Sequence, residues 1–349
     1  MGRYLTKEGK INMKWNLLFG RKKKRIVIIA FLVIILIVTA AIVVPRVLNP
    51  LPSILPSDAH RIIVIGKTNQ DISFWLSLRS GVDVAAKEFG VNYEYWSPDV
   101  ESDLDKQISL VYKAIEEKPD IIILAASDYE RLSEPAKAVV DAGIPLITLD
   151  STVNGNGKQI GSCFVATDNV AAGVKAGEAM QALLPEGKVL AVISPLIGTN
   201  SSKDRDRGVR QGLDPDTIAL PTADSAGSED IACQLASEIL KNPDIGGIVC
   251  LNEYATVGAA RAISGAGLSG KIILVGFDSS PSLNTYLEEG CLTATVIQRP
   301  FNMGYVAMAN AVSILNGNRI DPFYDTGSIL VTKDTMYLEE NEKLLFPFT

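Results

Sequence analysis

Short apolar runs alternate with segments of helical periodicity through most of this chain. Apolar runs predict strands at residues 62–65, 91–96, 121–125, 145–149, 188–193, 218–220, 247–250 and 272–277. Helical periodicity between them predicts helices at 74–89, 104–117, 135–142, 170–184, from about 204, 230–240 and 256–266. Such alternation is typical of βα units, whose parallel sheets are buried on both faces. Because the units exceed one comfortable sheet, we expect two α/β domains.

The amino-terminal region differs in charge from the rest of the chain. Residues 1–25 carry nine Lys or Arg and a single acid, Glu8, which makes this segment about +8. The whole chain has a net charge of −7, so residues 26–349 sum to about −15. An acidic body does not suit nucleic acid, whose phosphates are neutralised by Lys and Arg, so we expect no nucleic-acid partner.

Residues 26–44 are a run of 19 residues without a charge. At 1.5 Å per residue a helix of this length spans roughly 28 Å, about the thickness of a bilayer core. The basic residues before it place residues 1–25 in the cytoplasm and the remainder outside the membrane. A cleaved signal peptide with its cleavage site near residues 38–40 is the alternative, although signal-peptide cores are usually shorter. No Cys lies near the end of the run, which excludes a lipid-modified Cys anchor.

Residues 45–60 contain Pro45, Pro50, Pro52 and Pro56 and have little periodic pattern. We interpret them as a linker between the membrane helix and a binding domain at residues 60–349.

Polar side chains follow several of the predicted strands. Lys67 and Thr68 follow the first strand, Asp150 follows the strand at 145–149, Asn252 and Glu253 follow Cys250, and Asp278 follows Phe277. In open α/β sheets, ligands bind beyond the carboxyl ends of the strands. The sequence therefore places its polar residues where a ligand would bind.

Several short segments occur in the order and spacing of a known family. They are Thr68-Asn69 with Phe74-Trp75, residues 147–150, residues 166–169, Arg205-Asp206-Arg207-Gly208, Asn252-Glu253 with Gly258, residues 275–278, and Gln298-Arg299-Pro300. In these segments the chain resembles the type I periplasmic binding proteins, and within them the ribose-binding-protein group. The resemblance implies two α/β lobes, each a doubly wound parallel sheet, joined by three hinge crossings with a sugar in the cleft. Carried over, lobe one is about 60–167 and 299–327, and lobe two is about 168–298 and 328–349.

The resemblance also implies which residues bind the ligand. A sugar offers hydroxyl groups and an apolar C–H face, which suit carboxylates, amides, an Arg and aromatic rings. We expect Asp150 and Asp278 to accept hydrogen bonds, Arg207 to donate, and Asn252 and Gln298 to do both. Phe74 and Trp75 would stack on the sugar. Thr68, Thr167 and Tyr254 are further candidates, and no metal or other cofactor is expected.

The residues taken alone leave simpler interpretations open. Either aspartate could be a helix cap, Arg207 a solvated charge, and Trp75 a core residue. The chain also departs from the ribose binders, with Ile72 in place of an Asn, Ser151 in place of an Arg, and Ser225 in place of an aromatic residue. Tyr254 or Phe301 could replace that aromatic residue, so the sugar need not be ribose.

Other function classes find little support in the sequence. The only His, His60, lies in the linker, which removes Ser-His and Cys-His pairs and the common zinc sites, so we expect no enzymatic activity. Residues 265–270 fit GxGxxG but follow a helix and precede a strand, the reverse of a dinucleotide site. The sugar-responsive repressors share this two-lobed fold, but a DNA-binding motif would stand where the apolar run lies. Cys163, Cys233, Cys250 and Cys291 are expected to be core thiols, and their spacing does not establish a disulfide.

Two roles remain open for a tethered sugar-binding domain. It could deliver sugar to the permease of an ABC importer, or it could be a sensor subunit acting on a histidine kinase or chemoreceptor. The family favours transport, whereas a transmembrane helix in place of a lipid anchor favours sensing.

Overall fold

The computed structural model of the protein describes residues 60–346, which belong to one compact unit. The predicted basic tail, the membrane helix at 26–44 and nearly all of the linker lie outside the described residues. Among the helices that are described, none is both long and apolar enough to cross a membrane.

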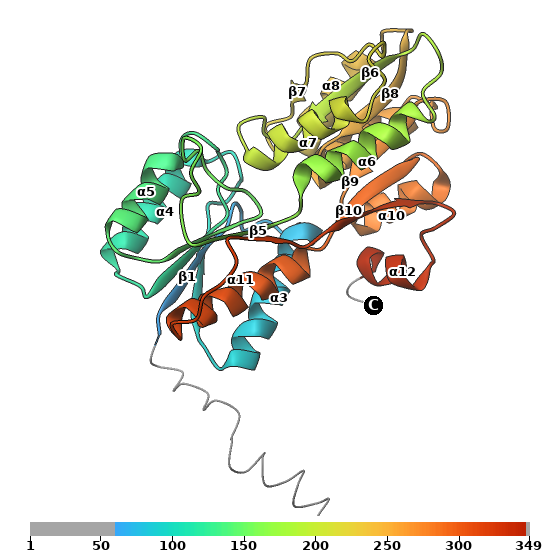
Figure 1. Cartoon of the computed structure of the whole chain (residues 1–349). Helices are drawn as coiled ribbons and strands as arrows, with labels where there is room; N and C mark the ends of the chain where they lie inside the picture. The colour runs from blue at the N-terminus through green and yellow to red at the C-terminus, as the bar shows by residue number, and fades with distance from the viewer. Residues whose placement is uncertain (1–59, 347–349) are drawn as a thin grey trace, which may run out of the picture. The chain divides into compact units, whose positions relative to one another are not determined.

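Six parallel strands form the first sheet, in the order β11-β5-β4-β3-β1-β2. Helices α3 and α11 cover one face of this sheet, and α4 and α5 cover the other (Figure 1). The strands are Ile62–Ile65 (β1), Tyr93–Trp96 (β2), Ile121–Leu124 (β3), Leu146–Leu149 (β4), Cys163–Ala166 (β5) and Phe323–Asp325 (β11). The helices are Ser73–Phe89 (α3), Leu104–Glu116 (α4), Ser133–Asp141 (α5) and Pro300–Leu315 (α11).

A second sheet repeats this plan in the order β12-β10-β9-β8-β6-β7, with only β12 antiparallel to its neighbour. Helices α6 and α7 pack on one face, and α8, α9, α10 and α12 pack on the other. The strands are Val189–Ser194 (β6), Ala223–Asp224 (β7), Ile245–Cys250 (β8), Ile273–Phe277 (β9), Ala294–Gln298 (β10) and Ser328–Thr332 (β12). The helices are Asn169–Gln181 (α6), Asn200–Gln211 (α7), Glu229–Ile239 (α8), Glu253–Gly265 (α9), Pro281–Glu289 (α10) and Glu339–Leu345 (α12).

The chain passes between the two sheets three times. It leaves the first sheet after β5, returns from β10 into α11, and leaves again from β11 into β12. We call the elements built on the first sheet lobe one and those built on the second sheet lobe two. The two-lobed α/β fold with parallel sheets expected from the sequence is thereby confirmed.

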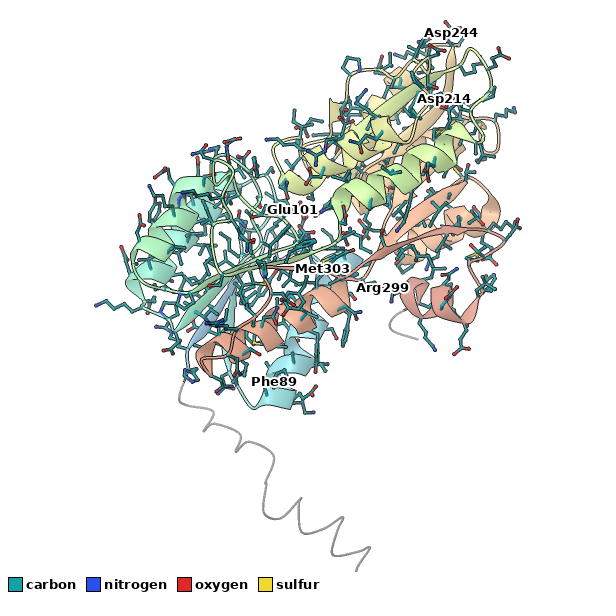
Figure 2. The ribbon with its side chains drawn as sticks, viewed as in Figure 1. Phe89, Glu101, Asp214, Asp244, Arg299 and Met303 are labelled. Atoms are coloured by element: carbon teal, nitrogen blue, oxygen red, sulfur yellow. The ribbon has the colours of Figure 1, made fainter. Side chains whose placement is uncertain are left out.

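Glycines allow the two main helix pairs to pack closely. A side chain on Gly81 or Gly304 would collide with the backbone of the partner helix in the α3–α11 pair, and Gly173 and Gly208 play the same part in the α6–α7 pair. Figure 2 shows Met303, at the start of α11, among the side chains of the lobe-one core that α3 and α11 share. In lobe two, the close packing of α6 on α7 places Gly173 against the backbone of Arg205. This packing therefore also positions the start of α7.

Two predicted elements differ most from the structure, and both lie near the start of lobe two. Residues 218–220 do not form a strand; only Ala219 makes an isolated bridge to Leu190, and the strand beside β6 is β7. Helix α7 begins at Asn200, four residues before the predicted start, because the hydroxyl of Thr199 accepts a hydrogen bond from the amide of Ser202 and caps it.

The four Cys residues are free thiols. Cys163, Cys250 and Cys291 are buried, as expected for core residues, whereas Cys233 is partly exposed.

Candidate functional site

The carboxyl ends of the parallel strands from both lobes meet around one cavity. Its volume is about 40 Å³, well below the roughly 300–1,000 Å³ of pockets that hold small molecules, so a sugar enters only after the lobes separate or side chains move. The lining residues lie in the segments that follow β1, β2, β4, β6, β8 and β9, at the end of β10, and in the first turns of α3, α7 and α9. They are Lys67, Ile72, Phe74, Trp75, Glu101, Asp150, Pro195, Thr199, Ser201, Ser202, Arg205, Asn252, Glu253, Tyr254, Asp278 and Gln298.

Asp150 and Asp278 occupy equivalent places in the two lobes. Each follows the third strand in the order given for its sheet, β4 or β9, and each donates its backbone N–H to the neighbouring strand, at 2.9 Å from the carbonyl of Val165 or Val296. Both adopt left-handed backbone conformations, with φ of 60° and 71°. Asp and Asn tolerate this region better than other residues with a side chain, and such strain is common at binding sites. Neither residue caps a helix, since Ser280 caps α10.

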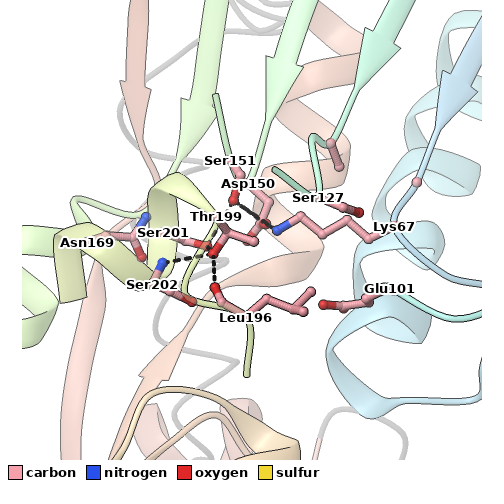
Figure 3. Close-up of polar contacts among 12 residues, drawn as sticks. Lys67, Glu101, Ser127, Asp150, Ser151, Asn169, Leu196, Thr199, Ser201 and Ser202 are labelled. Carbon is pink, nitrogen blue, oxygen red and sulfur yellow. Dashed lines mark hydrogen bonds and ion pairs between the residues drawn. The ribbon is translucent and has the colours of Figure 1, made fainter. Parts of the chain in front are cut away.

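Lys67, which lies just after β1, forms an ion pair with Asp150. Its Nζ lies 2.6 Å from Oδ2 of Asp150 and 2.9 Å from Oγ of Ser151 (Figure 3). Lys67 and Asp150 are only 3% and 4% exposed, so the pair is desolvated. The resemblance identified Ser151 as the place of an Arg in ribose binders. Lys67 therefore supplies a cation at this place from another strand.

Arg205 is the corresponding cation of lobe two. Its Nε donates to Oδ1 of Asn169 at 2.8 Å, and one terminal nitrogen donates to the carbonyl of Leu251 at 2.7 Å. The guanidinium lies 4.7 Å from the centre of the Phe277 ring. Its positive charge also opposes the rise that burial causes in the pKa of Asp278. The side chain is thus held rigidly at the cavity wall.

Asp278 is bound by groups on two neighbouring elements. Nε2 of Gln298 donates to Oδ1 of Asp278 at 2.7 Å, and the amide of Glu253 donates to Oδ2 at 3.2 Å. Oε1 of Gln298 is buried and has no hydrogen-bond partner. This amide oxygen is therefore free to accept a hydrogen bond from a ligand.

Aromatic side chains form part of the same wall. The rings of Phe74 and Trp75 meet edge to face, with centroids 5.0 Å apart. Nε1 of Trp75 donates to Oε1 of Glu101 at 2.6 Å, so Trp75 both belongs to the core of lobe one and lines the cavity. The hydroxyl of Tyr254 is buried and has no partner.

Contacts across the cavity join the two lobes. Oγ of Ser151 lies 2.9 Å from Oγ of Ser201, and the amide of Phe74 donates to Oε2 of Glu253 at 3.4 Å. The amide of Tyr129 donates to the carbonyl of Gly198 at 2.9 Å. The lobes are therefore in a closed arrangement.

The structure brings together most of the residues predicted for the site. Phe74, Trp75, Asp150, Asn252, Asp278, Gln298 and Tyr254 all line the cavity. Asn252 also caps α9 by accepting from the amide of Ala255 at 3.0 Å, a role that the sequence analysis considered only for the aspartates. Thr68 and Thr167 are buried but do not line the cavity, and Thr68 instead donates to the carbonyl of Asp99.

The prediction for Arg207 needs correction. Its side chain is 60% exposed and pairs with Asp204 on the surface of α7, at 2.7 Å. The arginine at the cavity is Arg205, two residues earlier. Because α7 starts at Asn200, the buried residues Ser201, Ser202, Arg205, Gly208 and Val209 share one face, and Arg207 lies off that face.

The two proposed replacements for the missing aromatic residue differ in position. Tyr254 lines the cavity, whereas Phe301 is 38% exposed and lies outside it. Ser225 is fully buried and donates to the carbonyl of Ser194.

Four charged residues of the cavity are absent from the predicted binding residues: Lys67, Glu101, Arg205 and Glu253. Lys67 follows an apolar strand directly, and Arg205 lies within a segment already matched to the family, so both had a usable signal. Glu101 lies five residues beyond the end of β2 with no pattern around it, and only the fold brings it to Trp75.

Burial dominates the electrostatics of the acidic residues here. It raises the pKa values of Glu101 and Asp278, and burial together with the nearby charge of Asp278 raises the pKa of Glu253 to about 8. In each case the charged form loses hydration. Hydrogen bonds from Trp75 and Gln298 oppose these shifts for Glu101 and Asp278.

Glu253→Gln is expected to raise the melting temperature of the ligand-free protein, by a margin that grows between about pH 5 and pH 8. The folded state keeps a proton on Glu253 up to about pH 8, whereas the unfolded state releases it near pH 4.5. Stability contributed by this group therefore falls as pH rises across that window. Thermal melts at several pH values measure the margin, with Glu238→Gln on the exposed side of α8 as the control. A margin independent of pH would contradict the assignment.

These features define a class of protein. A cavity between two hinged lobes, with carboxylates, amides, a guanidinium and aromatic rings on its walls, is suited to enclosing a small polar ligand. Among the described residues no group of His, Cys, Asp and Glu is arranged to hold a metal ion.

Comparison with known proteins supports this class. A family model described as a periplasmic binding protein domain matches residues 62–319. The D-allose-binding periplasmic protein of Escherichia coli is 30% identical over 274 residues, covering 74% of this chain and 88% of that protein. The ribose import binding protein RbsB of the same organism is 26% identical over 262 residues, covering 74% and 86%.

Solved structures agree with the sequence comparisons. An ABC transporter solute binding protein from Agrobacterium vitis, with bound D-fucose, is 30% identical with a TM-score of 0.78, covering 82% of this chain and 99% of that one. A sugar transporter from Clostridium phytofermentans is 38% identical with a TM-score of 0.72, covering 79% and 99%.

The chain therefore belongs to the periplasmic binding proteins, in the type I group that resembles the ribose-binding proteins. Its relatives are sugar-binding transport proteins, and it is a binding protein rather than an enzyme.

Proposed function

We propose that this protein binds a small sugar outside the cytoplasm, closes on it, and delivers it to an ABC-type importer while tethered to the membrane by residues 26–44. The observation that supports this most directly is the cavity itself. Two equivalent aspartates, one on each lobe, face a space that also meets Arg205 and the Phe74–Trp75 pair. Relatives with the same fold are named as import binding proteins or solute binding proteins of ABC transporters.

Each wall of the cavity suits a different part of a sugar. Asp150 and Asp278 accept hydrogen bonds from hydroxyl groups, Arg205 and Lys67 donate to ring and hydroxyl oxygens, and the rings of α3 contact the C–H face. Asn252 and Gln298 complete the polar contacts. The three chain crossings between the lobes are the hinge about which the cleft opens and closes.

Membrane tethering rests on the sequence. The positive cluster before residue 26, the uncharged run of 19 residues, and the proline-containing linker together favour an anchor with the binding domain outside. The same tether would also suit a sensor subunit that acts on a membrane kinase or chemoreceptor. Importer and sensor use the cleft in the same way and differ in the partner that distinguishes closed from open protein.

Residues 60–349, produced without the preceding segment, are expected to fold and to bind a monosaccharide with nearly the same Kd as the full chain. The cavity lies wholly in lobes one and two, so removing the tether removes no contact with the ligand. A thermal-shift screen of pentoses and hexoses measures binding, because a ligand at 100 times its Kd stabilises the native state by about 2.7 kcal/mol. Calorimetry then gives the Kd values of both forms.

In cells, the truncated form should differ from the full chain even though its Kd is unchanged. The tether raises the local concentration of the protein at its membrane partner, so the truncated form is expected to support much less sugar uptake at low expression. Absence of stabilisation by any common sugar at millimolar concentration would contradict the sugar-binding proposal. Full uptake from a freely secreted form, or a mature amino terminus near residue 41, would contradict the tether. Measuring kinase signalling in parallel with uptake separates the importer from the sensor.

A further inference from the structure

The cavity between the lobes holds more acidic than basic side chains. Its charged residues are all at least nine-tenths buried, so solvent does little to screen them. They comprise four carboxylates against two cations: Glu101, Asp150, Glu253 and Asp278 against Lys67 and Arg205. With every group ionised, the cavity would carry a net charge of about −2.

The two cations are already committed to two of the carboxylates. Lys67 is bonded directly to Asp150, and the charge of Arg205 acts on Asp278. Lys67 also attracts Glu101, but its ammonium group is held 2.6 Å from Asp150. Glu101 and Glu253 therefore lack a bonded cation of their own.

The hydrogen bonds made by these two glutamates do not replace a cation. Glu101 accepts one bond from the indole of Trp75, and Glu253 accepts a long one, 3.4 Å, from the amide of Phe74 and another from the side chain of Ser73. A carboxylate has about four acceptor sites, so part of the capacity of both groups is unused. Buried carboxylates in this state are stabilised by any donor that also carries a positive charge.

Two uncharged groups at the cavity wall also lack hydrogen-bond partners. Oε1 of Gln298 and the hydroxyl of Tyr254 are buried at the cavity wall without a hydrogen-bond partner, at 2% and 6% exposure of their residues. The charges of Glu101 and Glu253 both act on the Tyr254 hydroxyl and help to raise its pKa, so these three groups lie in one neighbourhood. This corner of the cavity combines acceptors with the rings of Phe74, Trp75 and Tyr254.

We propose that the ligand is an amino sugar, a sugar ring bearing a protonated amine, whose ammonium group lies among Glu101, Glu253 and the aromatic rings. This deepens the proposed function and rests on it, since Asp150, Asp278 and Arg205 retain their contacts with the hydroxyl groups. An ammonium group brings three donors and one positive charge, which matches the excess of acceptors and of negative charge. Aromatic rings add to its attraction when it is desolvated.

A neutral sugar would satisfy the same acceptors less completely. Its hydroxyl groups can donate to the glutamates but leave their charge uncompensated in a dry cavity. The alternative is that the glutamates bind protons, which their raised pKa values would allow. The charge of the two glutamates is therefore neutralised either by bound protons or by an ammonium group of the ligand, and binding measurements distinguish these two cases.

Titration calorimetry on the full chain in lipid nanodiscs at pH 7 tests the proposal. The probes are two matched pairs, D-glucosamine with D-glucose and D-galactosamine with D-galactose, together with D-ribose and D-allose as neutral references. We expect at least one amino sugar to bind about 10-fold or more tightly than its neutral partner and than both references. Glu101→Gln and Glu253→Gln should each reduce this preference toward one, whereas Glu238→Gln, far from the cavity, should leave it unchanged. Thermal melts confirm that each variant is folded.

The outcomes separate the inference from the function on which it depends. If a neutral sugar binds as tightly as any amino sugar, the inference is overturned and the proposed sugar-binding function stands. The inference is also overturned if the preference for an amino sugar survives in both glutamine variants. If no sugar of either kind binds to the wild-type protein, the proposed function itself fails.

Discussion

Replacing Asp278 with asparagine is expected to weaken sugar binding roughly 10- to 150-fold, because a hydrogen bond to a charged group contributes about 1.5–3 kcal/mol. The carboxylate lies at the end of β9, is 6% exposed, and is oriented by Gln298 and the amide of Glu253. Asparagine removes the charge and keeps one acceptor oxygen. It also tolerates the left-handed backbone, where φ is 71°, so the substitution changes affinity without forcing the strand end to move.

Calorimetry with the best sugar from the screen measures this effect, and a thermal melt of the ligand-free variant monitors folding. Asp278→Ala should lose at least as much affinity and also some stability, because alanine is strained in the left-handed region. Asp244→Ala, at the exposed amino-terminal end of β8, is the matched control and should bind normally. Unchanged affinity in Asp278→Asn would show that the carboxylate serves the fold rather than the ligand.

Arg205→Ala is expected to reduce affinity by about 30-fold or more, whereas Arg207→Ala should change it by less than about threefold. Truncating one member of a buried, hydrogen-bonded charge system costs about 2–5 kcal/mol. Arg205 is 4% exposed, bonded to Asn169 and the carbonyl of Leu251, and it faces Asp278. Arg207 pairs with Asp204 on the surface, where a salt bridge contributes about 0–1 kcal/mol.

Comparison of the two arginines is informative because they lie two residues apart on one helix. Alanine has a high helix propensity, so neither substitution should disturb α7 itself. Arg205→Lys provides a second variant that keeps the positive charge and loses the planar donor geometry, and it should have an intermediate affinity. If Arg207→Ala weakened binding as much as Arg205→Ala, the placement of α7 described above would be wrong.

The error over the arginines has a simple physical origin. Both lie in the segment that matched the family, and the choice between them depends on which face of the helix is buried. The sequence suggested a start near Asp204, but Thr199 caps a helix that starts at Asn200. Successive residues of a helix are about 100° apart, so two residues separated by one other point to nearly opposite sides. Here the packing of Gly173 against Arg205 and Gly208 decides which side of α7 is buried.

The strand at 218–220 was lost for a related reason. Three apolar residues satisfy the local pattern for a strand, yet only Ala219 reaches β6, while Ala223 and Asp224 supply the edge of the sheet. Short edge strands depend on what the neighbouring strand leaves unpaired, and local composition does not contain that information.

Much of the architecture was determined by local sequence. Runs of four or more apolar residues cannot be exposed at low cost, so strands such as Ile62–Ile65 and Ile121–Leu124 were predictable, as were amphipathic helices such as α4. Because parallel strands all end at one edge, the rule that ligands bind there also identified Asp150 and Asp278 from the sequence alone.

Tertiary structure decided the composition of the cavity. Lys67 reaches Asp150 across 83 residues of chain, and Glu101 meets Trp75 because β2 ends beside the start of α3. Such contacts depend on the register of strands and the crossing of helices, which are set by packing over the whole lobe. The sequence therefore determined which polar residues stand at strand ends, and the fold decided which of them share a desolvated space, because only long-range packing fixes those distances.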